Sequence, residues 1–328
     1  MSEVMYLNKA MAKAAMLEME NDDNIVLIGE DVVNRGGGLS NFIGVPQAFP
    51  DRCYDMPLSE QGYTHFSVGA ALAGQRPIVD LMFSDFVAVC ADTIINSAPK
   101  HRFFSLGKIS VPIVFCAGNG GRATYGGVGS GANHSQCIES WFTNVPGLKI
   151  VTPYYPGDAF NLMRASIRDN DPVLLLYHEG SLGKKSEVTE DSEVTLSNAG
   201  RVIKEGNDVT IVAIQSMVPV AEKAVEYFEK ENISVEIIDP RVLVPFDEET
   251  LYKSIRKTGR LVIIHEAHKR GGFGGEIAAL ASENCFKYLK APIQRVGALN
   301  APIPSGYLET YMMPNEEDLI RAVEETMK

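Results

Sequence analysis

Several motifs that usually identify an enzyme are missing from this sequence of 328 residues. No glycines follow the pattern G-x-G-x-x-G, so a site for a nicotinamide dinucleotide has no support. Neither glycine–lysine pair is followed by Ser or Thr, which excludes a P-loop, and no serine lies in G-x-S-x-G, the usual α/β-hydrolase nucleophile motif. No apolar stretch approaches the length that a membrane helix needs, so we expect no membrane partner.

Cysteine and positive charge are also scarce. Acidic residues outnumber basic ones by 42 to 30, and the net charge of −12 argues against a nucleic-acid partner. The helical pattern begins almost at Met1 and leaves no room for a signal or transit peptide. The five cysteines never form C-x-x-C, and we interpret them as reduced thiols: Cys53, Cys90, Cys116, Cys137 and Cys285. We therefore expect a soluble, cytoplasmic protein.

Helix and strand patterns alternate through the first half of the chain. Apolar residues at helical spacing predict a helix over residues 7–17 and another over 158–168. Short continuous apolar runs predict strands buried on both faces at 24–29, 77–83, 111–116, 148–151 and 173–177. This alternation is typical of a parallel sheet covered by helices on both faces.

The pattern changes between residues 179 and 200, where the chain is charged and has no period. We predict a first domain at 1–185, a linker at 186–200 and a second domain at 201–328. After the linker, strands at 209–214, 235–238, 261–264 and near 293 alternate with helices at 218–231, 248–257, 276–289 and from 316. The predicted fold class is α/β, with two doubly wound parallel-sheet domains.

Two short segments point to chemistry. Glu60 lies ahead of the small-residue run 68–74. It is either a surface carboxylate at a turn or a carboxylate that starts a buried helix, where the helix dipole favours it and the setting is apolar. His134 follows a segment, 118–132, that contains seven glycines. It is either an ordinary turn histidine or a proton-transfer group on a functional loop. Together the two residues suggest acid–base catalysis.

The segment H-E-A-H at 265–268 looks like a zinc motif, but its spacing is wrong. We expect it to end a strand, where residues i and i+3 point to opposite sides. The favoured interpretation is therefore a strand end without metal.

Several segments resemble one known family. P-L-S-E at 57–60, V-G-A-A-L-A-G-Q-R-P at 68–77 and H-S-Q at 134–136 resemble the beta chains of thiamine-diphosphate-dependent 2-oxo acid dehydrogenases, such as pyruvate, branched-chain and acetoin dehydrogenases. P-G-L-K-I-V-T-P at 146–153, G-G-F-G-G-E-I at 271–277 and A-P-I-P at 301–304 are similar to the same family. The resemblance covers nearly the whole chain. It implies a pyrimidine-binding domain followed by a transketolase C-terminal domain.

The resemblance also implies partners. The family's diphosphate-and-magnesium motif, Gly-Asp-Gly, lies on an alpha chain, and the nearest approach here is G-D-A at 157–159. Thiamine diphosphate would therefore be shared with an alpha subunit that holds magnesium, in a heterotetramer of two alpha and two beta chains. A lipoyl acyltransferase core is the other implied partner, docked by the end of the second domain.

Site residues follow from the same resemblance. It implies that Glu60 contacts the ring nitrogen of the cofactor's aminopyrimidine, where burial helps a carboxyl group to share its proton. It implies that Met82 and Phe86 pack on this ring, although ordinary core packing remains the alternative for both. It matches Glu30 and Asp92 to acidic positions that line a wet tunnel between paired active sites.

His134 would transfer a proton as the acyl unit passes to lipoamide. Near it the sequence departs from the family, because Cys116 stands where arginine is common and Asn133 replaces glutamine. Arg122, on a lengthened loop, is a candidate to supply the missing positive charge. Because this loop borders the substrate, these differences leave the identity of the substrate undecided. The resemblance also implies a potassium site, in which Asp171 replaces a more usual asparagine: Ile113, Ser166, Ile167, Asp169 and Asp171.

The predicted function is thus the beta subunit of an oxidoreductase with a disulfide acceptor, lipoamide. Its substrate would be a small 2-oxo acid, pyruvate-like or branched, or acetoin. The rival enzyme is the C-terminal half of a split transketolase acting on sugar phosphates, for which His65 and His101 leave some room. A non-catalytic chain that keeps the fold is the third interpretation, against which the presence of Glu60 and His134 argues.

Overall fold

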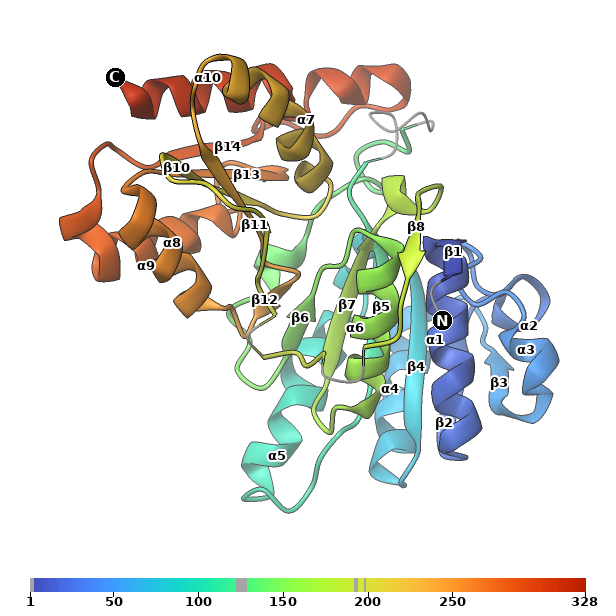
Figure 1. The fold of residues 1–328 in the computed structure, drawn as a ribbon. Helices are drawn as coiled ribbons and strands as arrows, with labels where there is room; N and C mark the ends of the chain where they lie inside the picture. Colours follow the sequence, from blue (N-terminus) through green and yellow to red (C-terminus); the bar gives the residue numbers. More distant parts are fainter. Residues whose placement is uncertain (1–2, 122–128, 192–193, 198) are drawn as a thin grey trace. The chain divides into compact units, whose positions relative to one another are not determined.

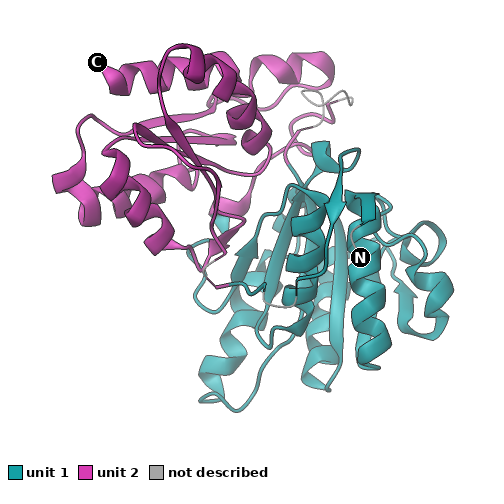
Figure 2. Cartoon of the chain, in the orientation of Figure 1, with its two compact units in different colours: residues 1–119, 141–196 teal, residues 120–140, 197–328 magenta. Residues whose placement is uncertain are grey.

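The structure, a computed structural model, describes residues 3–121, 129–191, 194–197 and 199–328. The chain forms two compact units, which Figure 2 shows in different colours. Unit 1 consists of Met1–Asn119 and Trp141–Leu196, and unit 2 consists of Gly120–Ser140 and Ser197–Lys328. No helix among the described residues is long and apolar enough to cross a membrane.

Unit 1 is built on a parallel sheet, with strand order β6-β7-β5-β4-β2-β3 among its own strands. The central strands are buried on both faces because helices cover them, and their sequences are accordingly continuous apolar runs. The strands are β2 (Ile25–Gly29), β3 (Cys53–Asp55), β4 (Arg76–Phe83), β5 (Val114–Asn119), β6 (Lys149–Val151) and β7 (Val173–His178).

Helices pack on the sheet of unit 1. Figure 1 shows α1 (Leu7–Asn21) and α6 (Pro156–Arg168) side by side in front of the strands, while α4 (Glu60–Leu72) packs against β4. The buried carboxylate of Glu18 on α1 joins this helix to α6 through Arg164 Nε at 2.7 Å. Three shorter helices complete the unit: α2 (Val32–Arg35), α3 (Val45–Ala48) and α5 (His101–Phe104).

Unit 2 contains a second sheet, in the order β14-β13-β10-β11-β9. Its strands are parallel except for β9, which is antiparallel at one edge. Helix α7 packs beside α10, and α8 packs beside α9. The elements are β9 (Arg201–Lys204), β10 (Val209–Ala213), α7 (Met217–Lys230), β11 (Val235–Asp239), β12 (Val242–Val244), α8 (Glu248–Thr258), β13 (Leu261–His268), α9 (Gly274–Cys285), β14 (Gln294–Ala298) and α10 (Glu316–Met327).

The predicted α/β class with two parallel-sheet domains is confirmed. Two details differ from the sequence prediction. Strand β8 (Lys185–Val188) lies mostly within the expected linker, and it pairs with β1 (Glu3–Tyr6), which precedes the expected helix. The glycine-rich segment, expected in the first domain, groups with unit 2. The linker at 186–200 remains a prediction.

Candidate active site

The predicted cofactor residues of unit 1 gather at the carboxyl edge of its sheet. Glu30 directly follows β2, Met82 lies near the end of β4, and Glu60 begins α4 shortly after β3. Because these strands are parallel, their carboxyl ends meet at one edge, where α/β proteins usually bind ligands. The sequence-based grouping of these three residues is thus consistent with the fold.

The site contains two acids with different surroundings. Glu30 is only 5 % exposed, and its carboxylate oxygens find no hydrogen-bond partner among the described residues. Burial, followed by the negative charges of Glu60 and Asp31, raises the pKa of Glu30 to about 7. Glu60 is half-buried in the first turn of α4, where the helix dipole favours a carboxylate. This edge therefore holds a proton near neutral pH.

A third acid, Asp80, was missed by the sequence analysis. Its side chain is completely buried, and burial raises its pKa to about 7 although backbone N–H groups of Met82 and Gly38 oppose the shift. Asp80 Oδ1 accepts a hydrogen bond from Met82 N at 3.2 Å, and Tyr63 Oη donates to the Asp80 carbonyl at 3.2 Å. The available signal was a carboxylate inside the apolar run 77–83.

Asp80 and its neighbours fix the backbone of Met82. Met82 has a left-handed φ of 55°, which is unusual for a residue with a side chain. Its N–H is held by Asp80, while its carbonyl accepts a hydrogen bond from Tyr177 Oη at 3.4 Å. A Cβ at Gly38 would lie 2.0 Å from Met82 Sδ, so a larger residue there would make the Met82 side chain move. The Met82 backbone is therefore held through both its N–H and its carbonyl, and its side chain packs against Gly38.

Met82 and Phe86 are the predicted apolar residues of the site. Met82 and Phe86 are both half-buried, and the Phe86 ring packs edge-on against Phe83 with centroids 5.5 Å apart. Half-buried apolar side chains near a carboxylate suit a flat, partly polar ring. Asp92 is largely exposed, and its carboxylate lies 3.6 Å from His65 Nε2.

His134 belongs to unit 2, unlike the other predicted residues of the site. It lies in a turn in which its N–H donates to the Gly131 carbonyl at 3.1 Å. Its Nδ1 lies 3.2 Å from Asn133 Oδ1, and the side chain is half-buried. Arg122, the candidate for a missing cation, lies outside the described residues.

Three of the five residues of the predicted potassium site, Ile167, Asp169 and Asp171, contact protein cations. Lys149 Nζ lies 2.6 Å from Asp169 Oδ2, and Arg76 Nη2 donates to the Ile167 and Asp169 carbonyls at 2.8 and 2.7 Å. Asp171 Oδ1 lies 2.5 Å from Arg102 Nε. The Ile113 carbonyl accepts a strand hydrogen bond and Ser166 Oγ donates to its own helix. These contacts would compete with a bound ion.

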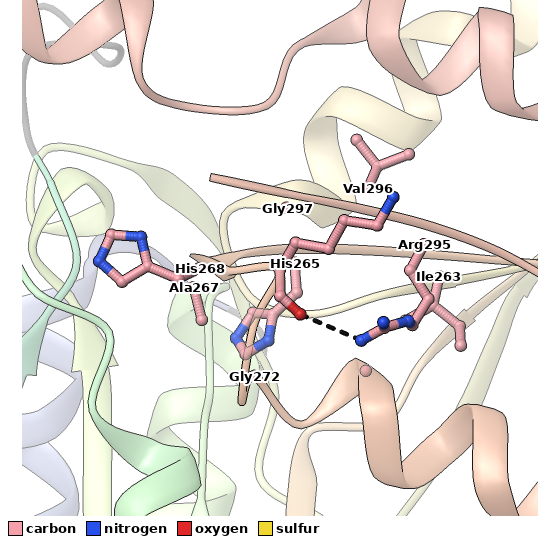
Figure 3. Close-up of a pocket in the computed structure, with 10 residues that line it drawn as sticks. Ile263, His265, Ala267, His268, Gly272, Arg295, Val296 and Gly297 are labelled. Carbon is pink, nitrogen blue, oxygen red and sulfur yellow. Dashed lines mark hydrogen bonds between the residues drawn. The ribbon is translucent and has the colours of Figure 1, made fainter. Parts of the chain in front are cut away.

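Unit 2 contains a pocket where β13 and β14 meet the start of α9 (Figure 3). The H-E-A-H segment lies in β13, as expected for a strand. Figure 3 shows the His265 and His268 rings pointing to different sides, so the two rings do not converge on one ion. His265 Nε2 lies 2.5 Å from Glu139 Oε1, and His268 Nδ1 lies 2.8 Å from the Leu299 carbonyl.

Comparison with known proteins identifies the family. Residues 3–185 match the transketolase pyrimidine-binding domain, and residues 198–319 match the transketolase C-terminal domain. The chain is 40% identical over 324 residues to the pyruvate dehydrogenase E1 component subunit beta-1 of Oryza sativa, covering 97% of this chain and 85% of the relative. It is 38% identical to the beta subunit of acetoin:2,6-dichlorophenolindophenol oxidoreductase of Bacillus subtilis, covering 98% and 96%.

A solved structure described as a split-gene transketolase, an inactive beta4 tetramer, superimposes with a TM-score of 0.79. It covers 98% of both chains at 22% identity, so this likeness concerns the fold. The chain belongs to the family of beta subunits of thiamine-diphosphate-dependent 2-oxo acid and acetoin dehydrogenases, as the sequence motifs predicted.

Proposed function

We propose that this chain is the beta subunit of a thiamine-diphosphate-dependent dehydrogenase. In this proposal the enzyme decarboxylates a small 2-oxo acid or cleaves acetoin, and transfers the acyl unit to lipoamide. The observation that carries it is the Glu30–Glu60 pair at the carboxyl edge of the sheet of unit 1. A pair of acids in which the pKa of one member, Glu30, is raised is suited to proton transfer at neutral pH.

The residues of unit 1 fit the pyrimidine half of thiamine diphosphate. The buried oxygens of Glu30 lack a partner in the described chain, and Met82 and Phe86 are half-buried apolar side chains in unit 1. The bound cofactor supplies carbanion-stabilising chemistry at the substrate carbonyl. Glu60 would bind the ring nitrogen and hold the proton shared there, Met82 and Phe86 would orient the ring, and Glu30 would keep a second proton nearby.

His134 would donate or accept a proton when the acyl unit leaves for lipoamide. A half-buried histidine in a hydrogen-bonded turn is suited to this role, because an imidazole ring can both donate and accept a proton. Replacement of His134 by Asn should therefore slow acyl transfer and leave cofactor binding intact. Thiamine diphosphate titration of the variant complex measures the second quantity.

An alpha subunit would complete the site and hold magnesium with the cofactor's diphosphate. This chain has no Gly-Asp-Gly, and its described residues contain no cluster of three His, Cys, Asp or Glu that could hold a metal. Leu58 and Phe66 flank Glu60 in sequence and are 83% and 57% exposed, which favours a covering partner. We propose a heterotetramer of two alpha and two beta chains that delivers acyl groups to a lipoyl acyltransferase core.

Potassium at Asp169 and a cytoplasmic location remain part of the proposal. Potassium would have to displace or share the contacts of Lys149 and Arg76 described above. Comparing the thermal unfolding midpoint of the complex in potassium and sodium salts at equal ionic strength tests this, because a bound ion raises the midpoint. An equal midpoint in the two salts would argue against the site.

The central test replaces Glu60 by Gln in the alpha–beta complex. Dye reduction is measured in parallel with pyruvate, a branched 2-oxo acid and acetoin, and Glu20→Gln is the matched control on an exposed residue of unit 1. We expect Glu60→Gln to lower turnover on the order of 100-fold or more while the complex still assembles. Near-normal turnover in this variant contradicts the role of Glu60, and inactivity of the wild type with all three substrates contradicts the substrate class.

The split-transketolase alternative has support only at the level of the fold. The pyruvate and acetoin dehydrogenase relatives share 40% and 38% of their aligned residues with this chain, against 22% for the split transketolase. Assay of the same complex with ketose phosphates distinguishes the two functions.

A further inference from the structure

Two buried carboxylates of unit 2 lie at the ends of the segment that carries His134. Glu266, on β13, is 3% exposed, and Glu309, in a short helical turn (Gly306–Tyr311), is completely buried. Burying a carboxylate is costly unless its contacts compensate. Neither residue has a part in the proposed reaction, so their contacts call for a separate explanation.

Glu266 contacts the chain on both sides of His134. Its Oε1 accepts a hydrogen bond from Gly121 N at 2.6 Å and lies 3.9 Å from the Cys137 thiol, which donates to it. Its Oε2 accepts a hydrogen bond from Ser216 Oγ at 2.5 Å, and this bond orients the carboxylate. Hydrogen bonds to a charged acceptor are among the stronger ones in proteins. One carboxylate thus anchors residues 121 and 137 together.

Glu309 lies against two glycines of the same segment. A Cβ on Gly121 would be 2.2 Å from Glu309 Oε1, and a Cβ on Gly129 would be 2.5 Å from Glu309 Oε2. Both distances are too short for real atoms, so the close approach requires glycine at both positions. The chain beside Glu309 is fixed as well, because Gly306 N donates to the Gly129 carbonyl at 3.0 Å and Ser130 forms a β-bridge with Ser305.

These anchored points continue directly into the His134 turn. Gly131 follows the Ser130 bridge, and its carbonyl accepts the His134 N–H at 3.1 Å. On the other side, the Gln136 carbonyl accepts a hydrogen bond from Gly120 N at 3.0 Å. His134 is therefore only a few residues away from chain that is hydrogen-bonded to Glu266 and lies against Glu309.

We propose that Glu266 and Glu309 are positioning residues for His134. They fix the described chain on either side of the histidine, residue 121 and residues 129–137, so that the imidazole keeps the orientation its proton transfer needs. The inference rests on the proposed function, in which His134 acts on the acyl unit. Small errors in the placement of a catalytic group cost large factors in rate, so loss of either anchor should lower turnover without removing any group that touches the cofactor.

The test uses the alpha–beta complex with Glu266→Leu, which removes both acceptor oxygens, and Glu266→Gln, which keeps one. Glu283→Gln, an exposed acid of α9, is the matched control. We expect Glu266→Leu to lower kcat on the order of 10- to 100-fold, with partial recovery in Glu266→Gln and an unchanged Kd for thiamine diphosphate. Amide exchange of residues 129–137 should rise in Glu266→Leu and stay at the wild-type level in the control.

A double-mutant cycle separates positioning from general damage. If Glu266 acts through His134, then Glu266→Leu causes little further loss of kcat in a His134→Asn background. If the two losses multiply, the positioning role is wrong. If His134→Asn alone is fully active, the proposed role of His134 fails instead, so the two failures are distinguishable.

Glu309 is tested by steric exchange. The three atoms nearest to a Cβ on Gly121 all belong to the Glu309 carboxylate. Gly121→Ala should therefore lower kcat, and the double variant Gly121→Ala, Glu309→Ala should recover part of the loss. Gly183→Ala is the control, since a Cβ there meets nothing within 4 Å. A double variant that is no better than Gly121→Ala overturns the contact as the cause.

Discussion

Glu30 provides a direct test of the electrostatics at the edge of unit 1. Burial and the charge of Glu60 raise its pKa from 4.5 to about 7. Between these two values the folded chain keeps a proton that the unfolded chain has lost. The free energy of unfolding therefore falls as the pH rises through this window, and the destabilisation is complete above pH 7.

The size of the effect follows from the two pKa values. Each pH unit between them changes the free energy of unfolding by about 1.4 kcal/mol, so Glu30 contributes about 3 kcal/mol of destabilisation at pH 8 relative to pH 4.5. Glu30→Gln removes the titrating group and keeps its shape. The variant should be more stable than the wild type at pH 8 by up to about 3 kcal/mol, and this difference should shrink to less than about 1 kcal/mol at pH 5.

The measurement is urea unfolding of the cofactor-free chain at pH 5, 6, 7 and 8, for the wild type, Glu30→Gln and the exposed control Glu20→Gln. Asp80, whose pKa is also raised to about 7, gives all three proteins a remaining pH dependence of the same sign. The difference between Glu30→Gln and the wild type reports Glu30 together with its effect on the pKa of Asp80, which the Glu30 charge raises. A difference that is constant from pH 5 to pH 8 would show that Glu30 stays ionised, and it would refute the reasoning.

Two further substitutions test the packing of unit 1. Gly37→Ala should lower the free energy of unfolding by at least about 1–2 kcal/mol, because Gly37 has a left-handed φ of 89°. The loss should be larger still, because the new Cβ would lie 2.0 Å from Asp80 Oδ2. Thermal unfolding midpoints of Gly37→Ala and the control Gly183→Ala measure this loss, and equal midpoints would contradict it. Arg164→Met should lower the free energy of unfolding by about 2 kcal/mol, because it removes a partner of the buried Glu18 carboxylate. If urea unfolding shows no loss, the second arginine that contacts Glu18, Arg168, is sufficient.

Elements with strong local patterns could be predicted from the sequence. Strands β5 and β7 are continuous apolar runs because both faces are covered, and such runs are readable without any partner. Helix α10 begins at a capping box in which Asn315 and Asp318 bond each other's backbone, so its start is fixed locally. The carboxyl-edge grouping of Glu30 and Glu60 follows from the same alternation, since parallel strands end together.

Elements that depend on distant partners could not be predicted. Strands β1 and β8 are short and largely exposed, and they form only because residues 3–6 meet residues 185–188 from the far end of unit 1. The placement of His134 in unit 2 likewise depends on contacts with residues that are distant in the sequence. Its segment is held by Glu266 and Ser305, whose positions in the chain give no local signal near residue 134.

Buried acids were the other omission, and the two units suggest how to find them. In unit 1 the Asp80 carboxylate occupies the space that a side chain at Gly37 would need, and in unit 2 Glu309 does the same at Gly121 and Gly129. A carboxylate can approach the backbone this closely because glycine has no Cβ in the way. Clustered glycines therefore mark places where an acid can be buried, and an acid inside an apolar run, such as Asp80, is the natural candidate to lie there.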